Sequence, residues 1–389
     1  MKPYIIIVLL SLILFSCSSK GMDINIRTDS VAMLKAIELY NQDNPDINIT
    51  ILPTHSQETV DIYIGNNLNN PGHLELLDEY PKDWLTDMNI DKFIESAQTV
   101  ILDNENKIIP LAFDVPLVLI DKSQAPNVFP LSIDMGTLTD QAIQYNVIST
   151  STSARRGYNP LWQPKFLDTL LLSYDTNIQL GSDFISWDSS VMKEAITKLT
   201  TFIDYDNGFR KKYFIEHPYN LLTSGRIKFW LVTFEEWLEM PENIRSETNF
   251  YFFNTDSKLE SLPQYLSIGL TPEGLKKKTP LEMVNWLLDS NNQKRIIDSR
   301  LESKDLIKGA YGGLSTIKAS NEYLSSLYKQ LAHRFPRSED FELYHHIPEH
   351  WDDFVETGLI PWFENPRIEK NEENFSQMVE NWHRSSLQE

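Results

Sequence analysis

The N-terminal part of the chain switches between two hydrophobic periodicities, and this switching restricts the fold more than any other feature. Residues 24–28 alternate apolar and polar side chains, as a β-strand does, and the same alternation returns at 47–51. Between them, residues 33–40 place apolar side chains on one helical face. A third short apolar run, 61–65, ends in glycine. Strand, helix and strand at this spacing predict a right-handed βαβ unit in a parallel sheet.

The same alternation continues along the chain, and its 389 residues are enough for two domains. Segments that alternate between strand and helix throughout predict an α/β architecture. The further strands are expected at 108–120, 225–232 and 265–270, and the further helices at 161–172, 189–203, 280–301, 322–334 and 350–358, with Phe375, Met378 and Trp382 on a final helix.

The first residues have the pattern of an export signal. Lys2 precedes an apolar run, 4–15, that is too short to span a membrane, which takes about 20 residues. Leu14-Phe15-Ser16-Cys17 then resembles a lipobox, and Cys17 is the only cysteine of the chain. We expect 1–16 to be a lipoprotein signal peptide, Cys17 to be lipidated and 17–22 to be a tether. An ordinary signal peptide or a membrane anchor is the alternative.

Composition excludes several classes of protein. Apolar residues make up 41% of the chain, so a large core is expected rather than disorder. The net charge of −20 argues against nucleic acid or an anionic lipid surface as a partner, and a solvated turn explains the run of three lysines at 276–278. With Cys17 lipidated, disulfides and cysteine-based metal sites are excluded. No cofactor is expected.

Several stretches, taken in order, resemble the extracellular solute-binding proteins of ABC importers, in the branch that includes maltose-binding protein. The first contains Asn44-Pro45-Asp46-Ile47, where the family has "NPDI". The stretches that carry the resemblance are 24–52, 61–64, 109–122, 184–203, 224–237, 265–297 and 309–317. The family has a helix between its second and third strands, whereas this chain has only residues 53–60 there.

This resemblance implies a periplasmic-binding-protein-like fold of two α/β lobes with a hinge and an interlobe cleft. It assigns 23–118 and 265–312 to the first lobe and 122–262 and 316–389 to the second. It also implies a monomer on the periplasmic side or at the cell surface. The protein would capture a small solute and deliver it to the permease of an ABC transporter. A sugar or oligosaccharide is the default solute of the family, and polyamines, peptides and sugar phosphates remain open.

Candidate ligand-binding residues come from two arguments. Clefts in such folds lie at the carboxyl ends of the strands, which selects Asp29, Asn66 and Asn67. Asp29 or Ser30 can instead cap the following helix, and the two asparagines can be turn residues. The resemblance adds Asp114 in the first crossover. The aromatic candidates for stacking on a ligand are Trp162, Trp237 and Tyr311, each of which can equally belong to the core.

Other functions remain open at this stage. The sequence contains no HExxH motif, no nucleophile elbow and no glycine-rich phosphate loop, so no catalytic residue is assigned. His345, His346 and His350 have a metal-like spacing, but Pro348 argues against one helix presenting them, and a solvated loop is expected. The alternatives are a surface lipoprotein that uses the fold for adhesion or sensing, and a lipid-anchored hydrolase.

Overall fold

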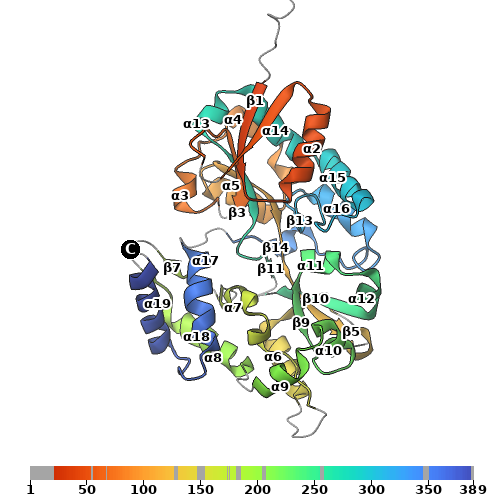
Figure 1. Ribbon diagram of the computed structural model, residues 1–389, viewed down its shortest axis with the longest axis vertical. Coiled ribbons are helices and arrows are strands. Elements are labelled where there is room, and N and C mark those ends of the chain that lie inside the picture. Colours follow the sequence, from red (N-terminus) through yellow and green to blue (C-terminus); the bar gives the residue numbers. More distant parts are fainter. Residues whose placement is uncertain are drawn as a thin grey trace, which may run out of the picture.

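The chain forms two α/β lobes, which lie one above the other in Figure 1. The computed structural model describes residues 22–53, 56–66, 68–126, 130–146, 154–172, 174, 176–180, 185–203, 207–254, 258–344 and 350–386. The expected two-lobe α/β fold is confirmed. Cys17 and the expected signal peptide lie outside the described residues.

The first lobe is built on a six-stranded sheet with the order β13-β4-β12-β3-β1-β2. Strand β1 pairs in parallel with both β2 and β3, as the βαβ prediction requires, whereas β12 runs antiparallel to its neighbours β3 and β4. The strands are β1 (Met22–Thr28), β2 (Ile47–Leu52), β3 (Ile62–Asn66), β4 (Ile108–Phe113), β12 (Leu266–Leu270) and β13 (Leu314–Ser315).

Helices pack around this sheet, and α2 and α14 contact each other beside β1. They are α2 (Met33–Asp43), α3 (Pro71–Leu74), α4 (Lys82–Met88), α5 (Glu95–Asp103), α13 (Pro272–Leu275), α14 (Lys278–Leu287), α15 (Ser290–Ser303) and α16 (Lys318–Leu327). The buried residues of α2 are Met33, Ala36, Ile37 and Tyr40, which confirms the predicted apolar face. Neither Asp29 nor Ser30 caps this helix, because the turn continues to Ala32 and the N-cap makes no side-chain hydrogen bond.

The link between β2 and β3 contains no helix in its described residues, 53, 56–61. It carries the chain across β1, because β2 and β3 lie on opposite sides of that strand. The alternation seen in β2 buries little, and Ile51 stays 41% exposed, because β2 is the edge strand of the sheet. The short link therefore leaves this edge of the first lobe open.

The second lobe contains a four-stranded sheet with the order β6-β10-β5-β9. Its strands are β5 (Pro116–Asp121), β6 (Ser132–Asp134), β9 (Trp230–Thr233) and β10 (Thr248–Asn254). Its helices before β12 are α6 (Met135–Tyr145), α7 (Leu167–Leu172), α8 (Ser189–Phe202), α9 (Asn207–Tyr213), α10 (Pro218–Thr223), α11 (Phe234–Glu239) and α12 (Glu242–Glu247). A small sheet pairs β7 (Gln179–Leu180) with β8 (Ile185–Ser186).

The C-terminal segment returns to this second lobe. Its helices are α17 (Trp351–Asp353), the π-helical turn η6 (Phe354–Leu359), α18 (Ile360–Glu364) and α19 (Glu372–Ser386). Helix α19 packs against α8 and buries Phe375, Val379 and Trp382. The final helix considered for Phe375, Met378 and Trp382 is present, and Met378 is only half-buried in it.

Two expected helices are divided by local signals in the chain. Residues 280–301 form not one helix but α14 and α15, because the Asp289 side chain caps a new helix by accepting hydrogen bonds from the amides of Asn291 and Asn292. Residues 161–172 become helical only from Leu167, after two 3₁₀ turns that begin at Pro160 and Pro164.

The lobes are connected by chain segments that hydrogen-bond to one another. Strand β4 belongs to the six-stranded sheet and β5 to the four-stranded sheet, so the chain changes lobes at Asp114. The amide of Leu262 donates to the carbonyl of Asp114 at 2.7 Å, and the amide of Ser261 donates to the carbonyl of Glu342 at 2.8 Å. Between the lobes, β11 (Leu259–Glu260) pairs with β14 (Phe341–Glu342) (Figure 1). The crossovers thus form one connected hinge region.

The position of helix α16 disagrees with the predicted assignment of residues 316–389 to the second lobe. It packs against α15 and β13 of the first lobe. The Asn321 side chain accepts a hydrogen bond from the amide of Ser315 and donates to its carbonyl, at 2.8 and 2.6 Å, which fixes α16 to β13. The chain therefore stays with the first lobe through Leu327.

Candidate functional site

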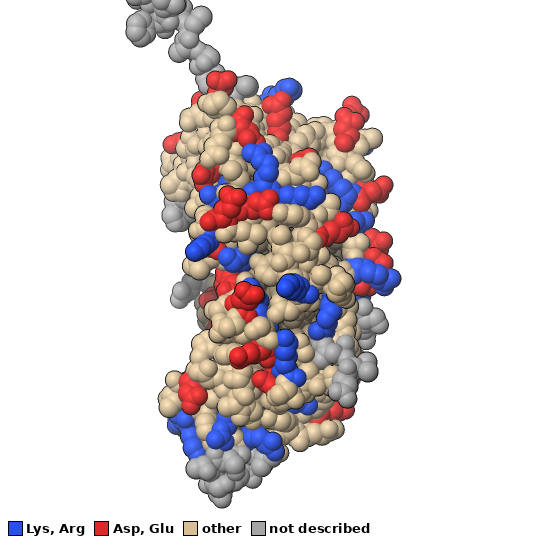
Figure 2. Space-filling model, turned by 90° about the vertical axis from the view of Figure 1, so that its right-hand side faces the viewer, with Lys and Arg blue, Asp and Glu red and all other residues tan. Residues whose placement is uncertain are grey.

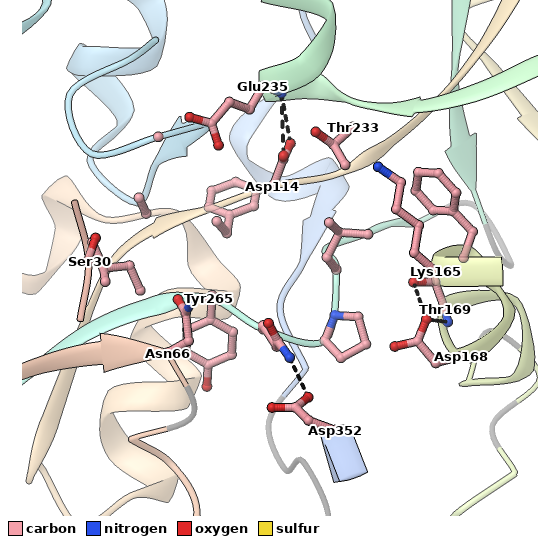
Figure 3. Close-up of a pocket in the computed structure, with 18 of the residues that line it drawn as sticks. Ser30, Asn66, Asp114, Lys165, Asp168, Thr169, Thr233, Glu235, Tyr265 and Asp352 are labelled. Carbon is pink, nitrogen blue, oxygen red and sulfur yellow. Dashed lines mark hydrogen bonds between the residues drawn. The ribbon is translucent and has the colours of Figure 1, made fainter. Parts of the chain in front are cut away.

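A cleft with a volume of about 660 Å³ lies between the two lobes. Such a volume falls within the range of small-molecule sites, roughly 300–1,000 Å³. The first lobe contributes Ser30, which follows β1, and Asn66, which is the last residue of β3. The second lobe contributes residues of α7 and α11. The hinge contributes Asp114 and the segment 262–265, so that both lobes and the hinge surround the same space (Figure 3).

Asp114 is the sequence candidate that lies most directly in this cleft. Its carboxylate accepts hydrogen bonds from the amide of Val115 at 2.8 Å and from the amide of Glu235 at 3.2 Å. Burial raises the pKa of Asp114 to about 6, although hydrogen bonds from Thr233 and from backbone amides oppose that rise. Asp114 therefore presents a carboxyl group that titrates close to neutral pH.

Glu235 lies beside Asp114 in the first turn of α11 (Figure 3). Burial, and then the charge of Asp114, raises the pKa of Glu235 to about 7. Gly312, from the first lobe, has φ +87°, and a β-carbon there would lie 3.0 Å from the Glu235 carboxylate. Glycine thus permits a backbone conformation that other residues rarely adopt and leaves room for this carboxylate.

A second acidic group lines the cleft from α7 and the C-terminal segment. Asp168 accepts a hydrogen bond from the amide of Thr169 at 2.7 Å, and burial raises the pKa of Asp168 to about 6. Asp352 accepts a hydrogen bond from the side chain of Gln264 in the hinge segment, and Glu356 lies one turn further along. Figure 3 shows Asp168 and Asp352 apart from the Asp114 and Glu235 pair.

Of the polar candidates at strand ends, the structure places one in the cleft and one outside it. Asn66 is exposed at the end of β3 and lines the cleft. Asp29 is exposed but does not line the cleft. The neighbouring Ser30 lines the cleft instead. Asn67 lies outside the described residues.

The aromatic candidates lie mostly in the core. Trp237 is 1% exposed, and its ring centroid lies 4.9 Å from that of Phe250. Trp162 packs against Phe214 at 5.2 Å between ring centroids. Neither Trp lines the cleft, so the site described here does not include them. Tyr311 does line the cleft, but its hydroxyl is directed to the carbonyl of Leu287, to which it donates at 2.6 Å.

The sequence argument missed the cleft carboxylates other than Asp114. The strand-end rule could have found Glu235, because it follows β9 by two residues. No comparable signal marks Asp168, Asp352 or Glu356, since they lie on helices that only the folded second lobe brings to the cleft.

The described residues were compared with the requirements of a metal site and of a membrane-spanning helix. Among the described residues, no group of three or more His, Cys, Asp or Glu side chains has a metal-binding arrangement. His345 and His346 lie outside the described residues, and His350 is the N-cap residue that precedes α17, with φ +58°. Within the described part of the chain, no helix combines the length and apolarity that crossing a membrane requires.

Comparison with solved structures finds this two-lobe arrangement in sugar-binding proteins. The sugar-binding protein MalE from Xanthomonas citri superposes with a TM-score of 0.65 at 12% identity, covering 94% of this chain and 97% of that one. The fold is that of the periplasmic solute-binding proteins. The cyclic α-maltosyl-1,6-maltose binding protein from Arthrobacter globiformis agrees, with a TM-score of 0.61 at 11% identity over 94% of this chain and 100% of the other.

The binding-protein fold also occurs in an enzyme. Thiaminase I from Clostridium botulinum, solved in complex with thiamin, has a TM-score of 0.55 at 13% identity, covering 92% of this chain and 99% of that one. Searches for a matching family model and for a matching curated protein find none. The resemblance expected from the sequence is therefore confirmed as a binding-protein fold, and the function must be argued from the cleft.

Proposed function

We propose that this protein is a substrate-binding lipoprotein that captures a small solute between its lobes and delivers it to the permease of an ABC importer. The observation that carries the proposal is the cleft of about 660 Å³, whose walls come from both lobes and from the hinge. The sugar-binding proteins that share the fold favour a sugar or oligosaccharide as the solute. In this role the protein is exported, anchored through lipid at Cys17, and acts as a monomer.

Capture follows from the position of the cleft. A ligand that contacts Asn66 on the first lobe and Asp168 on the second stabilises the closed arrangement of the lobes by its differential affinity for that state. Asp114 and Leu262, which are hydrogen-bonded to each other in the hinge, line the same cleft. Ligand binding and lobe closure are thereby coupled through the same residues.

A second candidate function is catalysis in the same cleft. It is favoured by the fold shared with thiaminase I and by the Asp114 and Glu235 pair, whose raised pKa values suit proton exchange near neutral pH. Steady release of a product from the bound solute would support this candidate over binding alone. Adhesion or sensing at the cell surface is the remaining alternative, which surface exposure without a neighbouring permease gene would favour.

The proposal is tested by a thermal-shift screen over sugars, polyols and organic cations, followed by calorimetry and small-angle X-ray scattering with each hit. We expect a ligand that raises the melting temperature, remains chemically unchanged and reduces the radius of gyration through closure. Asp114→Ala should weaken binding by about 1–3 kcal/mol if its carboxylate accepts a ligand hydrogen bond. If no small solute binds to the folded protein, the proposal is wrong.

A further inference from the structure

The charge of the interlobe cleft is almost entirely negative. Five carboxylate side chains line it, against one lysine and no arginine among the described residues. They are Asp114, Asp168, Glu235, Asp352 and Glu356. On the molecular face shown in Figure 2, by contrast, acidic and basic side chains are interspersed. The excess of acidic over basic side chains is therefore greater in the cleft than on that face.

The lysine does not neutralise these carboxylates. Lys165 forms its ion pair with Glu236, which does not line the cleft. Within the described residues, Asp114, Asp168 and Glu235 form no ion pair with a lysine or arginine. Arg300 lies near enough to Glu235 to favour its charged form, but it pairs with Asp305 at 2.7 Å. Within the described residues, the charges of Asp114, Asp168 and Glu235 are thus not neutralised by an ion pair with a lysine or arginine.

The free cleft makes ionisation of these groups costly. Asp114 and Asp168 are recessed, and their hydrogen bonds come from backbone amides and uncharged side chains. A recessed carboxylate without a counter-ion retains its proton more strongly than an exposed one. A cationic group placed between them would restore the charged form and donate charge-assisted hydrogen bonds to the carboxylates.

Other features of the cleft suit the rest of such a ligand. Phe113, Phe166 and Tyr265 line it as a packed apolar wall beside the acidic groups, and each is at most 2% exposed. Tyr265 is 2% exposed, and its hydroxyl has no hydrogen-bond partner among the described residues. A buried hydroxyl in this state is costly, and Figure 3 shows Tyr265 beside Asn66.

We propose that the solute bound in this cleft carries at least one protonated amine, which the carboxylates of Asp114 and Glu235 hold from the hinge and α11 while Asp168 and Asp352 face it from the other acidic group. This inference rests on the proposed function and narrows its ligand class. A neutral sugar offers hydroxyl groups but no charge, so it would bury the same carboxylates without compensating them.

The two ligand classes differ in their proton balance. A bound amine displaces protons from Asp114 and Glu235, because it stabilises their charged forms, whereas a neutral ligand that removes water from them causes proton uptake. The groups that act on Glu235 are Asp114, Glu236, Glu239 and Arg300, and Asp352 acts on Asp168. Amine affinity should therefore fall about tenfold or more between pH 8 and pH 5 as the carboxylates become protonated.

The test uses the purified full-length protein and pairs of small molecules that differ only in the amine. Glucosamine is compared with glucose and with N-acetylglucosamine, and putrescine and spermidine are compared with the corresponding diols. We expect melting temperature to rise by several degrees with an amine at about 100 times its Kd, and less with its neutral partner. Calorimetry in buffers of different ionisation enthalpy should show proton release at pH 7.

The variant Glu235→Gln should weaken amine binding by about 10- to 100-fold. Glu242→Gln, an exposed change on α12 with the same loss of charge, should have no effect. If neutral members bind and amines do not, or if binding takes up protons, the inference is wrong and the proposed function stands. If no member of the panel binds, both are wrong. The wild-type comparison decides the question even if Glu235→Gln does not fold.

Discussion

The carboxylate of Asp114 accepts a hydrogen bond from the backbone amide of Glu235 at 3.2 Å. This contact joins the first crossover between the lobes to the first turn of α11, where backbone amides otherwise lack partners. It also holds two carboxyl groups close enough for the charge of one to raise the pKa of the other. The ionisation of Asp114 in the hinge is therefore coupled to the ionisation of Glu235 in the cleft wall.

We predict that the ligand-free protein is more stable at pH 5 than at pH 8. Because burial raises the pKa of Asp114 and Asp168 to about 6 and that of Glu235 to about 7, the folded state binds more protons than the unfolded state between about pH 4 and pH 7. The contribution of these three groups to folding stability is complete at a pH below the pKa that each has in the unfolded state. It is lost as the pH rises through the pKa that each has in the folded state.

Differential scanning fluorimetry across this pH range measures the effect. Glu235→Gln removes one titrating group, so the loss of melting temperature between pH 5 and pH 8 should be smaller in that variant than in the wild type. Glu242→Gln serves as the control, because this exposed residue lies outside the cleft. Parallel pH profiles for wild type and Glu235→Gln would contradict the prediction.

Gly312→Ala should lower the free energy of unfolding by about 1–2 kcal/mol, because φ at this position is +87° and a β-carbon is strained there. It should also displace the Glu235 carboxylate, which lies 3.0 Å from the position of that β-carbon, and so change its titration in a ¹³C NMR experiment. Gly72→Ala is the matched control, because φ at Gly72 is not positive and the nearest atom lies at 3.7 Å. Equal effects of both changes would refute this account of Gly312.

Trp237→Ala should lower the free energy of unfolding by about 3–5 kcal/mol, because the ring is 1% exposed in the core of the second lobe. Urea denaturation measures the loss, and Ile215→Ala, at a residue 85% exposed, should change stability by less than about 0.5 kcal/mol. Trp237→Phe, which keeps an aromatic ring, should leave ligand affinity within about threefold of the wild type, a threshold equivalent to less than 1 kcal/mol. A larger loss of affinity would bring Trp237 back into the binding site.

Cys17 is predicted to carry the lipid anchor, because it is the only cysteine of the chain and follows Leu14-Phe15-Ser16. Metabolic labelling with an alkyne analogue of palmitate should label the wild-type protein, and the label should disappear in Cys17→Ala. Membrane fractionation should show the same difference, since stable anchoring depends on the attached acyl chains. Label that persists in Cys17→Ala would exclude Cys17 as the site.

Local features of the fold were available from the sequence. The apolar spacing of α2 predicted its buried residues, because helical periodicity fixes which side chains share a face. The alternation at 24–28 predicted β1 for the same kind of reason, and the alternation of strands and helices predicted an α/β architecture. The division into two lobes was implied by the family resemblance. Boundaries were less accurate where a single residue acts locally, as Asp289 does between α14 and α15.

The environment of each side chain was decided by the tertiary structure. A tryptophan that stacks on a ligand and a tryptophan in the core look the same in the sequence. Only the packing of the second lobe places Trp162 and Trp237 in its core. Asp168 and Asp352 are separated by nearly half the chain, yet they line one cleft because α17 returns to pack beside α7 through η6. A sequence pattern encodes which residues share an element, whereas burial and charge in a cleft depend on distances between elements, which arise only when the lobes assemble.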